Sequence, residues 1–230
     1  MIKDNLLNVH NNMDIAINNG NRDSKEVSLI AVTKTKPVSM LKEAYDCGER
    51  DFGENKVQEI LDKIDKLPSD IRWHMIGHLQ TNKVKYIADK IYMIHSVDSL
   101  KLALEISKQA VKCNRVIPVL VEINIGNEDS KFGINYEDAI PFMEELSTLP
   151  GIKVKGLMAI APYVSNPEDN RIHFKRMKQL FVDITQKNID NIEMSILSMG
   201  MTGDYMIAIE EGSTYVRVGT GIFGERNYSI

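Results

Sequence analysis

The stretch "LIAVTKTKPVSMLKEAYDCG", residues 29–48, contains the unit that decides the fold. It opens with a short, continuously apolar run, which is typical of a strand buried on both faces of a sheet. Further along, Leu41, Ala44 and Tyr45 recur on one helical face, and Gly48 marks a helix stop. The stretch therefore predicts one strand followed by one helix, which is the repeating unit of a parallel sheet.

The same alternation continues along the whole chain. Eight apolar runs are predicted as strands, at residues 28–34, 51–55, 73–78, 91–97, 116–124, 154–162, 192–200 and 214–220. Amphipathic stretches predicted as helices lie at residues 3–18, 38–48, 56–67, 99–112, 136–149, 170–187 and 204–212. No linker divides the chain, so we expect residues 1–230 to form a single domain. The pattern predicts a (β/α)8 TIM barrel preceded by an extra helix, and a doubly wound open sheet is the alternative.

The composition is that of an ordinary globular protein, with 43% hydrophobic and 26% charged residues. A net charge of −4 and the lack of any basic run argue against a nucleic-acid partner. Asp4 and Asp14 interrupt the N-terminal segment, so we do not interpret it as a signal peptide. No segment approaches the roughly 18 apolar residues of a membrane helix. Cys47 and Cys113 have no partner motif, and we expect reduced cysteines in a cytoplasmic protein.

The carboxyl ends of the predicted strands are where a barrel of this kind places its active site. Polar residues and glycines collect at these ends. In chain order they are Lys34, Glu54, Asn55, His78, Ser96, Asp98, Glu122, Asn124, Tyr163, Ser198, Gly200, Thr202, Arg217, Gly219 and Thr220. We therefore expect the functional site at this end of the barrel.

Two glycine-containing loops follow the last two predicted strands. "SMGMTGD", residues 198–204, opens a helix, and "GTG", residues 219–221, follows the eighth strand. Loops of this kind after strands seven and eight form the usual phosphate site of a barrel. The alternative is that these glycines only make tight turns. Because both loops carry the pattern, we favour a phosphate site.

Two other motifs fail their context tests. "GTGIFG", residues 219–224, matches the dinucleotide fingerprint, but a following strand and an acidic residue about 20 positions later are needed, and only six residues remain. His74 and His78 are four residues apart, which along a strand and its turn means about 13 Å. No cluster of other ligands accompanies them, so we expect no metal site.

Lys34 is an unusual residue for the end of a buried strand, because a buried ammonium group is costly. Side chains alternate along a strand, so Ile30, Val32 and Lys34 share a face and Lys34 is the last expected strand position. Lys36 precedes Pro37 and belongs to the loop. Burial lowers the pKa of a lysine, and a neutral amine can form a Schiff base. A Schiff-base lysine beside a phosphate site suggests pyridoxal 5′-phosphate (PLP), or a class I aldolase.

At this point the residues carry a resemblance to a known family. "AVTKTKP", "FGENKVQE", "WHMIGHLQTNK", "GLMAIAP" and "LSMGMTGDYMIAIEEGSTYVRVGTGIFG" together resemble the YggS/PROSC family of PLP homeostasis proteins, from about residue 28 to the end. The resemblance implies a barrel like the N-terminal domain of alanine racemase. It implies that Lys34 forms the internal aldimine with PLP. "TGDYM" departs from the wording expected at the start of the predicted helix at residues 204–212, which leaves the local contacts of that helix open.

The resemblance also implies the remaining cofactor contacts. Arg217 would approach the pyridine nitrogen, and Asn55 and His78 would lie near the ring. The expected phosphate ligands are Ser198, Gly200, Met201, Thr202, Gly219 and Thr220.

The family resemblance favours a PLP carrier or regulator in intracellular vitamin B6 homeostasis, with PLP-dependent apo-enzymes as partners. A PLP-dependent amino-acid racemase is the alternative. An arginine at the pyridine nitrogen weakens the electron sink, and the second base of alanine racemase, a tyrosine, comes from a separate β-domain that we expect this chain to lack. Tyr163 or Tyr205 is the substitute to consider. We expect a monomer without efficient catalysis, and for Lys36 a role in PLP transfer or in attracting phosphate.

Overall fold

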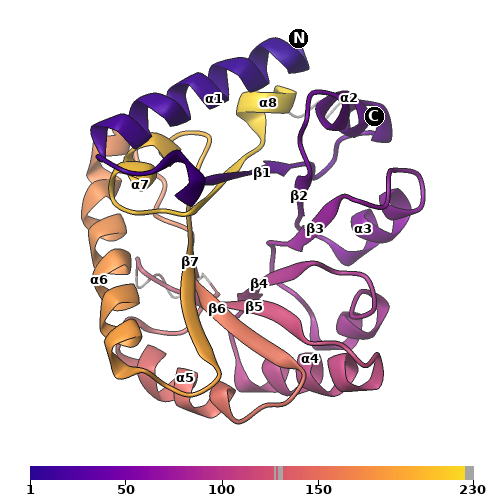
Figure 1. The fold of residues 1–230 in the computed structure, drawn as a ribbon, viewed down its shortest axis with the longest axis vertical. Helices are drawn as coiled ribbons and strands as arrows, with labels where there is room; N and C mark the ends of the chain where they lie inside the picture. The colour runs from indigo at the N-terminus through magenta and orange to yellow at the C-terminus, as the bar shows by residue number, and fades with distance from the viewer. Residues whose placement is uncertain (127, 129–131, 226–230) are drawn as a thin grey trace.

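The computed structural model describes residues 1–126, 128 and 132–225, and its strands form one closed parallel barrel in the order β1 to β8 (Figure 1). The strands are β1 (Ser28–Val32), β2 (Asp51–Glu54), β3 (Arg72–Met75), β4 (Met93–Val97), β5 (Ile117–Ile123), β6 (Ile152–Ala159), β7 (Ile192–Met201) and β8 (Tyr215–Val218). β1 pairs with β8 in parallel, with Ala31 opposite Val218, and this pairing closes the barrel. The predicted (β/α)8 barrel is confirmed, and the open sheet is excluded.

Helices surround the strands on the outside (Figure 1). They are α1 (Ile2–Asn19), α2 (Val38–Asp46), α3 (Val57–Ile64), α4 (Leu100–Lys112), α5 (Ala139–Ser147), α6 (Arg171–Lys187), α7 (Tyr205–Glu210) and α8 (Thr220–Phe223). After β3 a 3-10 segment, Thr81–Tyr86, takes the place of an α-helix. Of the helices in the described ranges, none has the length and apolar character needed to cross a bilayer.

The first strand ends earlier than the sequence predicts. β1 stops at Val32, so Lys34 lies two residues beyond the strand, in a turn. The backbone N–H of Thr33 still donates to the carbonyl of Gly53 at 2.9 Å, which extends the ladder by one hydrogen bond. The chain then leaves the sheet because Thr35 adopts φ 63°, in the left-handed region. The sequence leaves open which face of this strand points inward, and the structure shows that Ile30 lies on the inward face.

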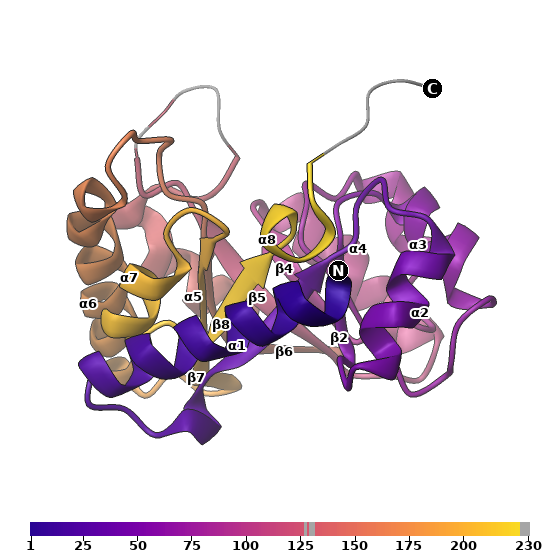
Figure 2. The same cartoon turned by 90° about the horizontal axis from the view of Figure 1, so that it is seen from above.

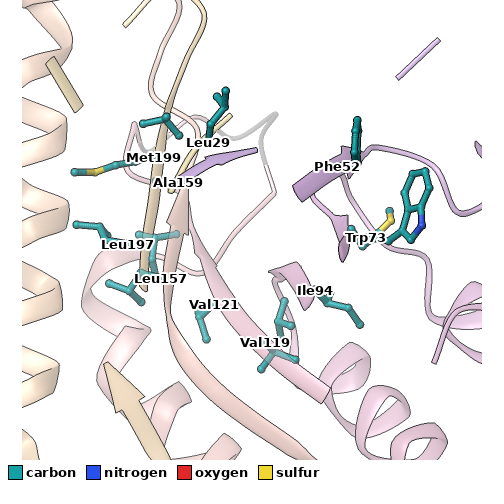
Figure 3. Packing of buried hydrophobic residues seen from close by; sticks show 14 of the residues in the cluster. Leu29, Phe52, Trp73, Ile94, Val119, Val121, Leu157, Ala159, Leu197 and Met199 are labelled. Carbon is teal, nitrogen blue, oxygen red and sulfur yellow. The ribbon is translucent and has the colours of Figure 1, made fainter. Parts of the chain in front are cut away.

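The two faces of the strands pack against different partners. Outward side chains such as Leu29, Phe52 and Trp73 form the main core with the helices, and Figure 3 shows them standing away from the strands. Ile30 is fully buried inside the barrel, where a side-chain carbon at Gly53 would come within 2.9 Å of it. The interior is partly polar: a small apolar cluster around Leu120 shares it with His74, His95, Ser198 and Arg217.

The N-terminal helix α1 belongs to the barrel's outer layer. It packs against α7 and α8, which have only six and four residues, and Figure 2 shows it running past both. Its buried residues, which include Leu6, Val9 and Met13, recur at helical spacing. The Asn5 side-chain amide donates to the carbonyl of Ile222 at 2.8 Å. Helix α1 therefore supplies the apolar cover that the two short helices cannot.

Replacing Leu6 by alanine tests this role of α1, with Leu7 as a matched control on the same helix. Leu6 is 3% exposed and Leu7 is 60% exposed. We expect Leu6→Ala to lower the free energy of unfolding by about 2–5 kcal/mol, because it opens a cavity under the helix. Leu7→Ala should change it by about 0.5 kcal/mol or less. Urea unfolding followed by circular dichroism measures both, and equal losses would show that α1 is not docked in this way.

Candidate functional site

A cavity of about 320 Å³ opens at the carboxyl end of the barrel, between the loops that follow β1, β2, β7 and β8. Its lining includes seven of the ten site residues that the sequence predicts: Lys34, Asn55, Met201, Thr202, Arg217, Gly219 and Thr220. Val32, Ile76, Ile160 and Gly203 complete the wall. The fold thus gathers the predicted lysine and most of the predicted phosphate residues around one space.

The other three predicted residues lie outside this lining. Ser198 is fully buried below the cavity, where its hydroxyl contacts Arg217. Gly200 lies within β7 and adopts φ 89°, and a side-chain carbon there would lie 2.5 Å from Ala208, so the close approach of β7 to α7 requires glycine. His78 lines a neighbouring cavity of about 640 Å³. Its ring contacts Asp98 at 2.9 Å. A direct contact of these three residues with a ligand stays a prediction.

The turn that carries Lys34 is strained and firmly anchored. Thr35 is β-branched and left-handed, a conformation that costs roughly 1–3 kcal/mol for a residue other than glycine. Its backbone N–H donates to a carboxylate oxygen of Glu59 on α3 at 2.5 Å. Lys34 itself is half-buried and reaches the cavity wall. The position of this lysine therefore depends on contacts made by its neighbours.

A buried charge cluster lies beneath this turn. The ammonium group of Lys63 donates to Glu54 at 2.6 Å, to Glu59 at 3.0 Å and to the carbonyl of Thr33 at 3.0 Å. The hydroxyl of Thr33 donates to the same oxygen of Glu54 at 2.6 Å. Burial raises the pKa of Glu54 to about 7, because the loss of hydration outweighs the attraction of Lys63. The cluster connects α3 and the end of β2 to the lysine turn.

Lys36 has a different environment from the one expected for an exposed loop lysine. Its ammonium group donates to the carbonyls of Phe223, Gly224 and Glu225 at 2.9–3.0 Å. These carbonyls lie at the end of α8, the short helix that begins with Thr220. Lys36 therefore ties the lysine turn to the loop after β8. The three carbonyls occupy the three donors of its ammonium group, which leaves the proposed role in attracting phosphate without support from the geometry.

The loops after β7 and β8 are joined through Thr202. Its hydroxyl oxygen accepts hydrogen bonds from the N–H groups of Gly219 at 3.3 Å and Gly221 at 3.4 Å. An oxygen that accepts two bonds directs its own hydrogen away from both donors. A side-chain carbon at Gly203 would meet no atom within 4 Å, so this part of the wall is open. The hydroxyl group of Thr202 thus lines the cavity with its hydrogen directed away from the two loop N–H groups.

The chemistry of the wall favours an anionic ligand that carries an electrophile. Among the described lining residues the ionisable ones are Lys34 and Arg217, and none carries a carboxylate. The hydroxyls of Thr202 and Thr220 suit phosphate oxygens. A lysine amine at the other side suits an aldehyde. The residues present therefore fit a cofactor with both groups, as PLP has.

Arg217 on β8 forms the inner end of the cavity. It is 4% exposed, and its guanidinium group donates to the Ser198 hydroxyl at 2.6 Å and to the carbonyl of Ala159 at 2.8 Å. Burial lowers the pKa of Arg217 to about 10. This pKa still lies well above neutral pH, so the side chain is a fixed cation that donates hydrogen bonds and accepts none.

A chain of buried side chains continues from Arg217 through the barrel interior. Ser198 contacts Nδ1 of His95 at 3.1 Å, Nε2 of His95 contacts Nδ1 of His74 at 2.9 Å, and Nε2 of His74 contacts Asp51 at 2.9 Å. Burial lowers the pKa of both histidines, so both rings are neutral at pH 7. With neutral rings, each side chain in this series accepts one hydrogen bond from the Arg217 side and donates one towards Asp51, so every contact has one donor and one acceptor.

Sequence reasoning missed both supporting networks for identifiable reasons. The spacing of His74 and His78 in the sequence gives no sign of the buried contacts of His74 with His95 and Asp51. Among the described residues, no group of three His, Cys, Asp or Glu side chains is suited to a metal. His95 lies in the middle of an apolar run, and only the inward face of β4 reveals its role. Glu59 and Lys63 read as an ordinary surface pair on a helix, because nothing local indicates that Glu54 lies beneath them.

Comparison with known proteins places these features in a family. The model of the alanine racemase N-terminal domain matches residues 5–227. A pyridoxal phosphate homeostasis protein of Aquifex aeolicus is 46% identical over 87% of both chains, and one of Haemophilus influenzae is 38% identical over 99% of this chain and 97% of its own. The structure of PipY of Synechococcus elongatus PCC7942 with PLP bound has a TM-score of 0.83 at 31% identity, over 97% of this chain and 100% of PipY.

More distant structures share the barrel alone. Alanine racemase of Clostridium difficile 630 has a TM-score of 0.72 at 16% identity, over 95% of this chain and 58% of the racemase. The family match covers nearly the whole chain, and the relatives above 30% identity described here match 87–99% of it. The chain therefore belongs to the alanine racemase N-terminal domain family and, within it, to the pyridoxal phosphate homeostasis proteins.

Proposed function

We propose that this protein binds PLP in the cavity at the carboxyl end of the barrel, through an internal aldimine with Lys34. The observation that carries the proposal is the composition of the cavity wall, which sets one amine opposite two hydroxyl- and glycine-bearing loops and includes no carboxylate among its described residues. In this role the protein is a monomeric carrier or regulator in PLP homeostasis, and it passes PLP to PLP-dependent apo-enzymes.

Each side of the cavity has its own task in this proposal. The amine of Lys34 adds to the aldehyde carbon of PLP, the carbonyl oxygen leaves as water, and a C=N bond replaces the C=O bond. Met201, Thr202, Gly219 and Thr220 hold the phosphate. The remaining assignments are that Arg217 donates to the pyridine nitrogen and that Asn55 and His78 lie near the ring. Ser198 and Gly200 stay predicted phosphate ligands.

The relatives support PLP as the ligand. The names of the curated relatives refer to pyridoxal phosphate homeostasis, and PipY has been solved with PLP bound. The match to these proteins extends over almost the entire chain in each case, so the lysine turn and both phosphate loops lie within the compared region.

The wall of the cavity favours a carrier over a racemase. Racemisation needs an acid–base group on each face of the cofactor, and Lys34 can serve one face. Tyr163 is 99% exposed and Tyr205 is 6% exposed in the outer core, and neither is part of the described lining. A charged Arg217 can only donate a hydrogen bond to the pyridine nitrogen of PLP. That nitrogen must then accept the bond in its unprotonated form, which makes the cofactor a weaker electron sink.

Borohydride reduction followed by peptide mapping tests the covalent link. We expect a pyridoxyl adduct on Lys34 in the protein loaded with PLP, because borohydride converts a C=N bond into a stable amine. Lys34→Ala should lose both the adduct and the yellow absorbance. Lys36→Ala is the matched control, and it should keep the adduct on Lys34. An adduct on Lys36 that survives Lys34→Ala would refute the assignment.

Exchange of the α-proton of amino acids with solvent deuterium separates a carrier from a racemase. We expect L-alanine and D-alanine to exchange no faster with the loaded protein than with free PLP at the same concentration, because the described cavity wall holds no second base. Proton NMR follows the exchange, and chiral chromatography checks for inversion. Sustained turnover that disappears in Lys34→Ala would establish racemase activity instead.

A further inference from the structure

The cluster beneath the lysine turn has a role that extends beyond holding α3 on the barrel. We propose that Lys63 and Glu59 are positioning residues that set the reactivity of Lys34 towards the PLP aldehyde. This inference rests on the proposed function, because it concerns the amine that forms the C=N bond. Neither residue is part of the cavity lining, and both contact the backbone of the turn that carries Lys34.

The cluster fixes the peptide groups on both sides of Lys34. On one side, the carbonyl of Thr33 accepts a hydrogen bond from Lys63 at 3.0 Å. On the other side, the N–H of Thr35 donates to Glu59 at 2.5 Å. The side chain of Lys34 leaves the backbone between these two anchored groups. Two residues of one helix, four positions apart on the same face, thus anchor the backbone on both sides of Lys34.

Lys63 is the centre of this arrangement. An ammonium group has three donors, and here all three are used, on Glu54, Glu59 and the Thr33 carbonyl. The side chains of Lys63 and Glu54 are 8% and 0% exposed, so their contacts are shielded from water and salt. Such a fully bonded, buried cation is rigid, and it transmits the position of α3 to the turn.

The left-handed Thr35 indicates that the cluster constrains the turn rather than following it. A β-branched residue avoids φ 63° unless its surroundings impose it. The bond from Thr35 N–H to the Glu59 carboxylate is a charge-assisted one and can impose this conformation. Without it, the turn can relax, and the amine moves relative to the aldehyde carbon.

The covalent and the phosphate parts of the site can be separated experimentally. None of the hydrogen bonds that the described residues Glu54, Glu59 and Lys63 make reaches Thr202, Gly219 or Thr220. Pyridoxine 5′-phosphate has the ring and phosphate of PLP but no aldehyde. Its binding therefore reports on the non-covalent contacts with the ring and phosphate alone. A positioning role predicts different effects on the two ligands, whereas a general loss of structure affects both.

The first test uses Lys63→Met, with Lys66→Met as the exposed lysine control. We expect the rate constant for aldimine formation with PLP, followed by its absorbance in a stopped-flow instrument, to fall roughly tenfold to a hundredfold, because a small misplacement of a reacting group has this effect. The dissociation constant of pyridoxine 5′-phosphate should change by about twofold or less, since the phosphate loops are not in contact with the cluster. Lys66→Met should leave both values unchanged.

The second test covers the case in which Lys63→Met does not fold, because that variant leaves Glu54 buried without its partner. Glu59→Ala removes the acceptor of the Thr35 N–H and leaves the pair of Lys63 and Glu54 intact. Asp62→Ala is its control, since Asp62 is exposed on the same helix and bonds Gln58. We expect slower aldimine formation in Glu59→Ala alone, again with unchanged binding of pyridoxine 5′-phosphate.

Two results would overturn the inference: equal losses for PLP and pyridoxine 5′-phosphate, or unchanged aldimine formation in Glu59→Ala. Failure of the proposed function has a different signature. If Lys34→Ala retains the yellow adduct, Lys34 is not the reacting amine, whatever Lys63 and Glu59 do. Loss of the adduct in Lys34→Ala together with normal rates in the cluster variants would leave PLP binding in place and remove only the positioning role.

Discussion

The parallel pairing of β1 with β8 is the interaction on which the site depends. It sets Ile30 beside Arg217 and Ala31 beside Val218, and so brings the first and last strands of the barrel into one wall. The turn after β1 carries Lys34, and the loop after β8 carries Gly219 and Thr220. An open sheet of the same strands would leave these residues at opposite edges. Closure of the barrel, supported by α1 on its outer side, therefore brings the Lys34 amine and the hydroxyl groups of the loops after β7 and β8 into one cavity.

The barrel interior contains more charge than an apolar core tolerates, and hydrogen bonding compensates it. Arg217 is a buried cation, yet its contacts with Ser198 and the Ala159 carbonyl begin a chain that ends at Asp51. Neutral histidines link the two charges without adding a third. The same logic applies to Lys63, which is surrounded by oxygens. In both networks a polar group that would destabilise the core on its own instead fixes a residue of the cavity.

The sequence predicts the architecture well because strand–helix alternation is a local pattern. The eight strands, the N-terminal helix and the association of Lys34 with two glycine loops follow from it. The supporting residues do not, because their roles arise from contacts between distant segments. Lys63 looks like one more surface lysine until β2 places Glu54 beneath it, and the close packing of Gly200 against α7 is equally invisible in the local sequence. The end of β1 is also missed, since the left-handed Thr35 depends on a carboxylate from α3.

The division of the cavity into two sides suits a protein that must both hold and release its ligand. The loops after β7 and β8 offer hydrogen-bond donors to an anion, and such binding is reversible without chemistry. In the proposed function, the turn after β1 would add one covalent bond, which water can reverse. The described wall has neither a carboxylate nor a second base that would carry a bound aldehyde beyond imine exchange. An anchored lysine turn next to a separate anion site is therefore the arrangement that the proposal of capture and release of PLP requires.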